Sequence, residues 1–272
     1  MPRPQQLSTN GLFATLGDDL FAAFLEFIGT TFFLLFALGG VQAVTAEQGA
    51  GNASGSERVL YISLCFGFSL VVSAWLFFRV TGGLFNPNVS LALFLCGVIG
   101  PVRFVLYCLA QLVGSIAAAG LVLALTPGPL ASNTTLAPGI NSAQGVFIEM
   151  FVTSALALSV LMLAAEKHQS TPFAPIGIGL TLFVAELWSV YYTGGSVNTA
   201  RAFGPAVVTG FPDGHHWVYW VGPFLGSLLA SLFYAILKHY RYWRLNPDQD
   251  TTRPEKSPSD PVDRVASQMQ QV

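Results

Sequence analysis

The chain has 272 residues, of which 53% are hydrophobic and only 10% are charged, and its formal net charge is −2. Soluble proteins carry about 25% charged residues, so this composition excludes an ordinary soluble domain and indicates an integral membrane protein. The slightly acidic charge balance also leaves no basic face for binding nucleic acid. Three cysteines, Cys65, Cys96 and Cys108, lie in apolar stretches. We expect them to be small core residues rather than a disulfide or a set of metal ligands.

The chain opens with a polar, proline-bearing segment, residues 1–19, which we expect to be a cytoplasmic N-terminal segment without a cleavable signal peptide. A bilayer crossing needs about 20 apolar residues. Six stretches are long enough, at about 20–44, 59–80, 102–125, 144–166, 173–192 and 216–238. Two further apolar pieces, about 87–97 and 199–209, are too short to span. Residues 126–143 are expected to form an outer connecting loop, and the polar residues 241–272 a disordered cytoplasmic tail.

The two halves of the chain repeat each other. The segment from Thr81 to Asn86 reads Thr-Gly-Gly-Leu-Phe-Asn, and Thr-Gly-Gly-Ser-Val-Asn ends at Asn198, 112 positions later. A glutamate-bearing span precedes each break, with Glu26 in the first half and Glu149 in the second. A span that runs from a tyrosine to a Gly-Ser pair follows each break, with Tyr107 and Gly114-Ser115 in the first half and Tyr219 and Gly226-Ser227 in the second. Three matches in the same order indicate the duplication of a three-span unit, with the first repeat at 20–125 and the second at 144–240. A duplicated Gly-rich break of this kind is typical of a site at a repeat interface in a membrane protein.

The odd number of spans in each repeat predicts the architecture. After three crossings the second repeat runs inverted, so the two Asn breaks enter from opposite faces and can meet at mid-membrane. Non-spanning backbone is tolerated at that depth only where it lines a cavity or is buried in protein. We therefore predict an all-α membrane protein with six transmembrane helices and two re-entrant half-helices, 86–97 and 198–209.

The basic residues predict the orientation. With both termini inside, the inner segments carry Arg3, Arg79, Arg103 and Lys167, and six more basic residues lie from Lys238 to Arg264, whereas the outer segments carry only Arg58 and Arg201. This orientation places two Asn-x-Ser/Thr sequons outside, so Asn52 and Asn133 are candidates for glycosylation. We expect a multi-pass protein, located in the plasma membrane, with both termini cytoplasmic.

Each break ends at an asparagine that precedes a short helix. Asparagine is a strong N-cap, and Pro87 stands at the first helical position, where its missing N–H costs nothing. Capping uses the side-chain oxygen and leaves the NH₂ group to donate into a cavity. With two half-helix N-termini of about +0.5 charge each, Asn86 and Asn198 are predicted to attract oxygen lone pairs and repel cations. Arg201 places a guanidinium in the membrane, where it has a pore role or forms a structural ion pair.

Four segments carry a resemblance to a known family: Gly82–Pro87, Ala110–Gly114, Thr193–Arg201 and Trp220–Phe224. Over about residues 20–240 the chain resembles the major intrinsic protein family, the aquaporins and aquaglyceroporins. The resemblance implies a homotetramer in which every subunit has its own pore. It also implies that Glu26 and Glu149 hold the backbone of the loops before the half-helices.

The usual Asn-Pro-Ala motif of this family is altered in both halves. It reads Asn86-Pro87-Asn88 in the first half and Asn198-Thr199-Ala200 in the second. Both pore asparagines are present. Asn88 adds bulk and polarity near the start of its half-helix, and Thr199 lacks the preset φ of proline, so the second half-helix is expected to be less rigid.

The resemblance places an aromatic/arginine filter at four positions: Phe66, Glu186, Gly195 and Arg201. The position of Glu186 resembles a site that is occupied by histidine in orthodox water channels. We expect Glu186 to pair with Arg201, which would keep the carboxylate ionised. Such a pair would also occupy donors that Arg201 otherwise offers to water, which leaves open a low conductance or a preference for hydrogen peroxide or ammonia.

The function favoured by these features is a passive, single-file channel for water that excludes ions and protons. Two alternatives stay open: a channel for hydrogen peroxide or another small neutral solute, and a poorly conducting member with a structural or signalling role. The chain shows no HExxH motif, acidic metal cluster or nucleophile with a base, so we expect neither an enzyme nor a cofactor or metal. The expected partners are the solute, the lipid bilayer and further copies of the chain.

Overall fold

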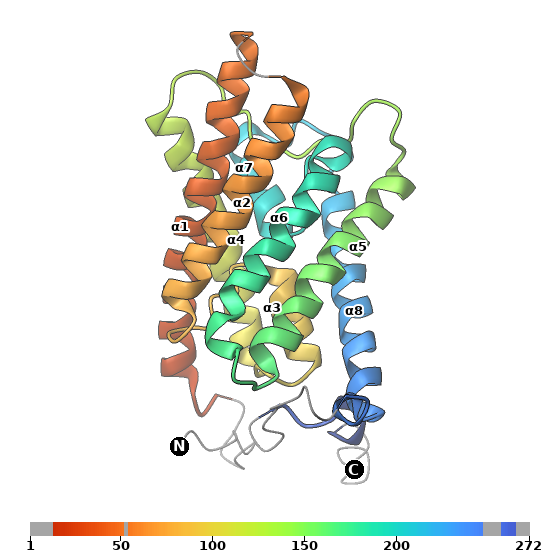
Figure 1. Ribbon diagram of the computed structural model, residues 1–272. Helices are drawn as coiled ribbons and strands as arrows, with labels where there is room; N and C mark the ends of the chain where they lie inside the picture. The colour runs from red at the N-terminus through yellow and green to blue at the C-terminus, as the bar shows by residue number, and fades with distance from the viewer. Residues whose placement is uncertain (1–12, 52–53, 247–256, 265–272) are drawn as a thin grey trace.

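The computed structural model describes residues 13–51, 54–246 and 257–264, and these residues form helices and loops without a β-strand. Figure 1 shows the helices as an upright bundle. Its α-helices are α1 (Leu16–Gly49), α2 (Gly55–Phe77), α3 (Pro87–Leu95), α4 (Pro101–Leu125), α5 (Ser142–Val160), α6 (Ala174–Thr193), α7 (Thr199–Thr209) and α8 (Val218–His239). A π-helical turn, Leu161–Ala165, continues α5, and 3₁₀ turns occur at Thr171–Phe173 and Tyr242–Arg244.

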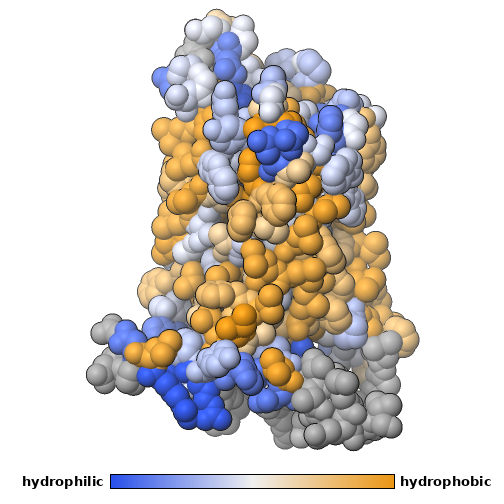
Figure 2. All heavy atoms as spheres, turned by 90° about the vertical axis from the view of Figure 1, so that its right-hand side faces the viewer, coloured by the Kyte–Doolittle hydropathy of each residue, from blue (hydrophilic) through white to orange (hydrophobic). Residues whose placement is uncertain are grey.

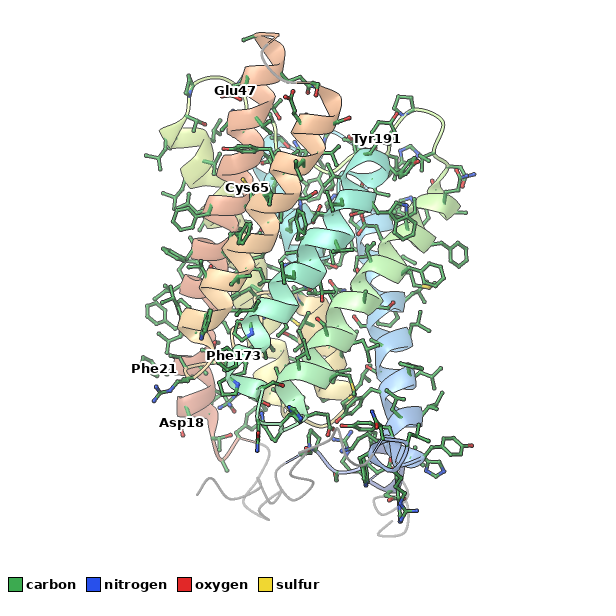
Figure 3. All side chains as sticks on the ribbon, in the orientation of Figure 1. Asp18, Phe21, Glu47, Cys65, Phe173 and Tyr191 are labelled. Carbon is green, nitrogen blue, oxygen red and sulfur yellow. The ribbon has the colours of Figure 1, made fainter. Side chains whose placement is uncertain are left out.

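Six of these helices are long and apolar enough to cross a membrane, which confirms the predicted all-α class. The space-filling view shows a broad hydrophobic belt between two hydrophilic ends (Figure 2). Helix α1 has 34 residues, Leu16–Gly49, and is longer than the predicted span of about 20–44. At 1.5 Å per residue it is about 51 Å long. The charged residues Asp18 and Glu47 therefore lie near opposite ends of the bundle, and Phe21 and Tyr191 project from its sides (Figure 3).

The packing of the spanning helices follows the repeat. Helix α1 packs along α4, α5 packs along α8 in the same way, and α2 packs against α6 between the two halves. Gly114 in α4 and Gly226 in α8 permit the first two contacts, because an added Cβ would lie 2.9 Å from the Phe27 carbonyl oxygen and 2.6 Å from the Met150 carbonyl oxygen, respectively. Small residues at helix crossings allow this close approach in membranes.

The two short helices occupy the interior of the bundle from opposite ends. Helix α3 lies in the lower half and α7 in the upper half, and α1 begins at the same lower end at which α8 ends (Figure 1). The loops before them adopt a left-handed backbone at equivalent positions, with φ of 52° at Phe85 and 54° at Val197. Such conformations are rare for non-glycine residues and persist only where their surroundings hold them.

The loop between α4 and α5 packs against the helices, with contacts to α1 and α7. The Gln42 side chain fastens it, because its Nε2 donates to the Pro129 carbonyl at 3.0 Å and its Oε1 accepts from the Ala131 N–H at 2.8 Å. Ser132 is consequently fully buried. The Asn133 amide donates to the Thr209 hydroxyl at 2.9 Å. A glycan would attach to that same nitrogen, which keeps one hydrogen for the bond, so glycosylation at Asn133 stays a prediction. Asn52 lies outside the described residues.

The end of the chain departs from the expected disordered tail wherever the structure describes it. Residues 257–264 lie against the lower end of the bundle, where the Ser257 hydroxyl accepts from the Lys167 N–H at 3.0 Å and Arg264 donates to the Leu95 carbonyl at 2.7 Å. Composition alone predicted disorder because this stretch is polar, but backbone carbonyls at helix ends provide acceptors for it. The other residues after Asn246 lie outside the described ranges.

Candidate pore and filter

Asn86 and Asn198 are the N-caps of α3 and α7. The side-chain oxygen of Asn86 accepts from the backbone N–H groups of the second and third residues of α3, Asn88 at 2.8 Å and Val89 at 3.4 Å. The side-chain oxygen of Asn198 does the same for α7, at 2.9 and 3.3 Å. These bonds satisfy two of the N–H groups that a helix start otherwise leaves without partners. Both asparagines are almost fully buried, at 3% and 5% exposure.

We expected capping to leave both side-chain NH₂ groups free, but each of them makes one hydrogen bond within the protein. Asn86 Nδ2 donates to the Val197 carbonyl at 3.0 Å, and Asn198 Nδ2 donates to the Phe85 carbonyl at 2.9 Å. Each half thus binds the loop of the other half across the middle of the molecule. An amide carries two hydrogens, so one N–H of each asparagine remains for a molecule in the cavity.

Glu26 holds the loop before α3. Its carboxylate accepts from the N–H groups of Leu84 at 3.1 Å and Phe85 at 2.9 Å. It also accepts from the Thr81 hydroxyl at 2.5 Å and from the Gln111 amide at 2.9 Å. Four donors on one buried carboxylate satisfy a group that would otherwise be very costly in an apolar interior.

Glu149 holds the loop before α7 in the equivalent manner. It accepts from the Thr193 hydroxyl at 2.6 Å and from the N–H groups of Ser196 at 3.0 Å and Val197 at 2.8 Å. In each half the strained residue before the asparagine therefore gives its N–H to a glutamate and its carbonyl to the opposite asparagine. These opposed bonds explain how Phe85 and Val197 are kept in their left-handed conformation.

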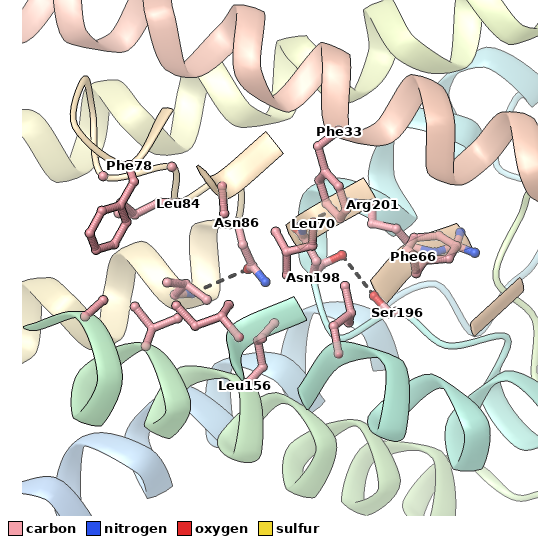
Figure 4. Close-up of a pocket in the computed structure, with 18 residues that line it drawn as sticks. Phe33, Phe66, Leu70, Phe78, Leu84, Asn86, Leu156, Ser196, Asn198 and Arg201 are labelled. Carbon is pink, nitrogen blue, oxygen red and sulfur yellow. Dashed lines mark hydrogen bonds between the residues drawn. The ribbon is translucent and has the colours of Figure 1, made fainter. Parts of the chain in front are cut away.

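A narrow cavity runs past these asparagines (Figure 4). The volume within which the centre of a water molecule can lie is about 30 Å³. Its walls are mostly apolar and come from α1, α2, α5 and α6, with Phe33, Leu70, Leu156 and Leu182 among them. The polar side chains on its lining are those of Asn86, Ser196, Asn198 and Arg201. The cavity therefore has an apolar wall, which offers no hydrogen bonds, and a small set of side chains that can form them.

Arg201 and Phe66 lie together at the upper part of this cavity. The guanidinium carbon is 4.9 Å from the centre of the Phe66 ring, which is within cation–π range. Arg201 is only 2% exposed, and its two terminal nitrogens donate to the carbonyls of Ser132 at 2.7 Å and Gly194 at 3.3 Å. Its Nε has no hydrogen-bond partner among the described residues.

The expected ion pair between Glu186 and Arg201 is wrong. Within the described part of the chain, no salt bridge or hydrogen bond joins them, and both carboxylate oxygens of Glu186 are buried without a partner. The carboxylate instead lies against Gly195, where an added Cβ would be 1.8 Å from Glu186 Oε2. Neither Glu186 nor Gly195 is among the residues that line the cavity. Arg201 therefore takes its acceptors from backbone, and its charge is not neutralised by a contact pair with Glu186.

Sequence reasoning missed the carbonyl of Ser132, which receives the strongest bond of Arg201. A backbone acceptor leaves no signal in the residue type. The indirect signal is Gln42, a polar side chain deep in the first span, which holds the loop that carries Ser132.

The altered motif residues all lie at the junction of α3 and α7. Pro87 and Thr199 are the first residues of their helices, and Asn88 and Ala200 are the second. The side-chain oxygen of Asn88 accepts from the N–H of Thr199 at 2.9 Å. The Thr199 hydroxyl, which has one hydrogen to donate, lies 3.0 Å from this oxygen and 3.0 Å from the Tyr219 carbonyl oxygen. The described residues contain no cluster of side chains suited to a metal ion.

Six spanning helices, two half-helices and a buried polar line through the bundle define a multi-pass membrane channel. Comparison with known proteins agrees: the family model described as major intrinsic protein matches residues 18–234. The chain therefore belongs to the major intrinsic protein family, whose members are channels and not enzymes.

Individual relatives support the same assignment. The chain is 68% identical to "Aquaporin-1" of Laccaria bicolor over 254 residues, which covers 92% of this chain and 82% of that protein. It is 52% identical to "Aquaporin-7" of Botryotinia fuckeliana over 238 residues, which covers 85% of this chain and 52% of that protein. The crystal structure of the aquaglyceroporin from Plasmodium falciparum shares the fold, with a TM-score of 0.63 at 22% identity, over 77% of this chain and 94% of that one.

Proposed function

We propose that the protein is a passive channel for water. The observation that carries this proposal is the pair of amide N–H groups that Asn86 and Asn198 retain, after capping and cross-bonding, on a narrow and otherwise apolar cavity. Two donors at one depth hold the oxygen of a single small molecule. The apolar wall opposite leaves that molecule few other partners, so it moves on with little resistance.

The same geometry supports exclusion of cations and protons. The N-termini of α3 and α7 face each other at the asparagines, and each contributes a partial positive charge of about +0.5. Arg201 adds a full positive charge on the same lining. A water molecule held by its oxygen at the centre points its hydrogens away from both donors, which interrupts a chain of waters that could relay protons.

Stopped-flow light scattering on proteoliposomes tests the proposal, with peroxide uptake measured alongside. Leu182 lines the cavity, whereas Leu180, on the same helix, is 46% exposed on the outside of the bundle. We expect fast osmotic shrinkage with the wild type and with Leu180→Trp, and shrinkage no faster than in empty liposomes with Leu182→Trp, because a tryptophan there fills the cavity.

Three results would change this assignment. Fast shrinkage with folded Leu182→Trp would place the pathway elsewhere. Peroxide entry without water flux would make the cargo hydrogen peroxide or a similar small solute. Neither flux, in wild-type protein that is folded, would favour a structural or signalling role.

We also propose a plasma-membrane location with both termini in the cytoplasm, and a homotetramer with one pore per chain. The end at which α1 begins and α8 ends carries most of the basic residues, including Arg103, Lys167, Lys238 and Arg264. Basic residues favour the cytoplasmic side. Relatives named aquaporin support the tetramer through their family only.

A further inference from the structure

The junction between the two half-helices is symmetric in position but not in chemistry. Under the 112-residue repeat, Asn88 corresponds to Ala200 and Pro87 corresponds to Thr199. Pro87 and Ala200 are apolar and have no side-chain hydrogen-bonding group. Asn88 and Thr199, at the equivalent positions, are both polar and bond to each other. The chain therefore carries an apolar and a polar residue pair at positions that the repeat relates.

The polar pair is closely bonded. Asn88 Oδ1 lies 2.9 Å from the backbone nitrogen of Thr199 and 3.0 Å from its hydroxyl oxygen. Both residues are nearly buried, at 5% and 3% exposure. The N–H of Thr199 is the donor that proline lacks at the equivalent Pro87. Asn88 therefore satisfies the one backbone donor that the threonine introduces.

Helix α8 anchors this pair from outside. The Ser227 hydroxyl lies 2.8 Å from the carbonyl oxygen of Asn88, and the Thr199 hydroxyl lies 3.0 Å from the carbonyl oxygen of Tyr219. The repeat equivalent of Ser227 is Ser115, whose hydroxyl has no hydrogen-bond partner among the described residues. The connection to α8 thus belongs to the polar pair of the junction.

We propose that Asn88 and Thr199 are a positioning pair that fixes the first turn of α7 relative to α3. Thr199 follows Asn198 directly and precedes Arg201 by two positions, and both of those side chains line the cavity. A rotation of this turn would displace the second amide donor and the guanidinium together. This inference rests on the proposed transport of water for its readout, but not for its physical basis.

A mutant cycle at this junction tests the proposal. Asn88→Ala leaves the Thr199 N–H without a partner, and one unsatisfied buried donor shifts an equilibrium by about tenfold. We expect the water permeability per folded protein to fall by about that factor. Thr199→Pro alone should also lower it, because Asn88 Oδ1 then loses the N–H donor and the hydroxyl that it shares with the Tyr219 carbonyl. The double variant Asn88→Ala/Thr199→Pro should recover most of the lost permeability, since it places here the residue types of the repeat-equivalent positions Ala200 and Pro87.

The backbone already permits this proline. Asn198 has φ −157° and ψ 111°, close to the φ −151° and ψ 116° of Asn86, which precedes Pro87. Extended backbone is what a residue before proline requires. The comparison variant is Thr199→Ala, which removes the hydroxyl but keeps the N–H bond to Asn88, and it should lose less permeability than Asn88→Ala.

Recovery in the double variant is the result that a merely additive loss of stability cannot produce. If Asn88→Ala conducts like the wild type, or if the double variant conducts no better than the worse single variant, the proposal is overturned. Should the wild type itself conduct no water, the proposed function fails separately. The thermal unfolding midpoints of the same four proteins then decide: coupling between the two sites supports the pair, and strict additivity rejects it.

Discussion

At the scale of single residues, the position of the Glu186 carboxylate requires a glycine at position 195. The carboxylate occupies the space where any side chain at position 195 would begin, because an added Cβ lies 1.8 Å from Oε2. Gly195 also has φ +61°, a conformation that glycine adopts without strain. Two separate restrictions, one of space and one of backbone, therefore apply at this position.

The first prediction separates these restrictions. Gly195→Ala should destabilise the protein by about 2–4 kcal/mol, the sum of overpacking of about 1–3 kcal/mol and left-handed strain of about 1 kcal/mol. Glu186→Ala/Gly195→Ala should regain the overpacking part and retain the strain. The midpoint of thermal unfolding in detergent measures both effects. A double variant no more stable than Gly195→Ala would show that the carboxylate does not limit the space.

The same residues show how far sequence carries at this scale. The capping by Asn86 and Asn198 was predicted from residue type and position, and the loop contacts of Glu26 and Glu149 were implied by the family resemblance. The bonds from the two asparagine amides to the opposite loops were not predicted. The pairing of Glu186 with Arg201 failed because charge complementarity does not include direction. The two terminal nitrogens of Arg201 donate instead to the carbonyls of Ser132 and Gly194, and backbone acceptors are present at every position of a chain.

Helix contacts are the central feature at the scale of elements. Helix α4 carries two glycines with different surroundings, Gly114 and Gly120. An added Cβ at Gly114 would lie 2.9 Å from the Phe27 carbonyl oxygen and 3.1 Å from Thr30 Cβ, whereas nothing lies within 4 Å of one at Gly120. Gly114 therefore sets the distance between α4 and α1, and Gly120 does not.

The second prediction uses this difference within one helix. Gly114→Ala should force α4 away from α1 and cost about 1–3 kcal/mol. Gly120→Ala should change stability little, or raise it by up to about 1 kcal/mol through its higher helix propensity. Unfolding midpoints of the two variants, compared under the same detergent conditions, provide the measurement. Equal midpoints would mean that the α1–α4 contact adapts to the extra carbon.

Elements were easier to predict than their contacts. Length and apolarity identified every spanning helix, and the asparagine caps identified the starts of α3 and α7. The extension of α1 to Gly49 and the π-helical turn at Leu161–Ala165 were not predicted. The apolar stretch that defines a membrane span ends before Ala46, and the last turn of α1 is exposed, so apolarity does not indicate where this helix ends.

The whole molecule combines an inverted repeat at its centre with unrelated structures at its ends. The glutamates, the strained loops and the asparagine cross-bonds recur in both halves. The lower end has no such repeat. There Glu166 accepts from Tyr234 and lies 2.8 Å from Lys238 Nζ, and residues 257–264 pass beneath α3. The repeated elements thus supply the two asparagines that line the central cavity, whereas the described lower end does not follow the repeat.

Arg264 joins the chain end to the half-helix that carries Asn86. Its Nη2 donates to the Leu95 carbonyl at 2.7 Å, and its guanidinium lies against Gly97, where an added Cβ would be 1.1 Å from Nη1. Leu95 is the last residue of α3. A positive charge at a helix C-terminus satisfies a free carbonyl and interacts favourably with the helix dipole.

The third prediction is that Arg264 stabilises the lower end of α3 without affecting its start at the centre of the membrane. Arg264→Ala should remove about 0.3–1 kcal/mol of local stability and therefore speed hydrogen exchange about two- to fivefold at the N–H groups of Cys96, Gly97 and Val98, which close the helix end. Arg244→Ala, in the 3₁₀ turn after α8, serves as the control and should leave those rates unchanged. Because α3 is capped separately by Asn86, exchange near its first turn should not respond to either variant; a uniform increase along α3 would mean instead that the chain end holds the whole half-helix in place.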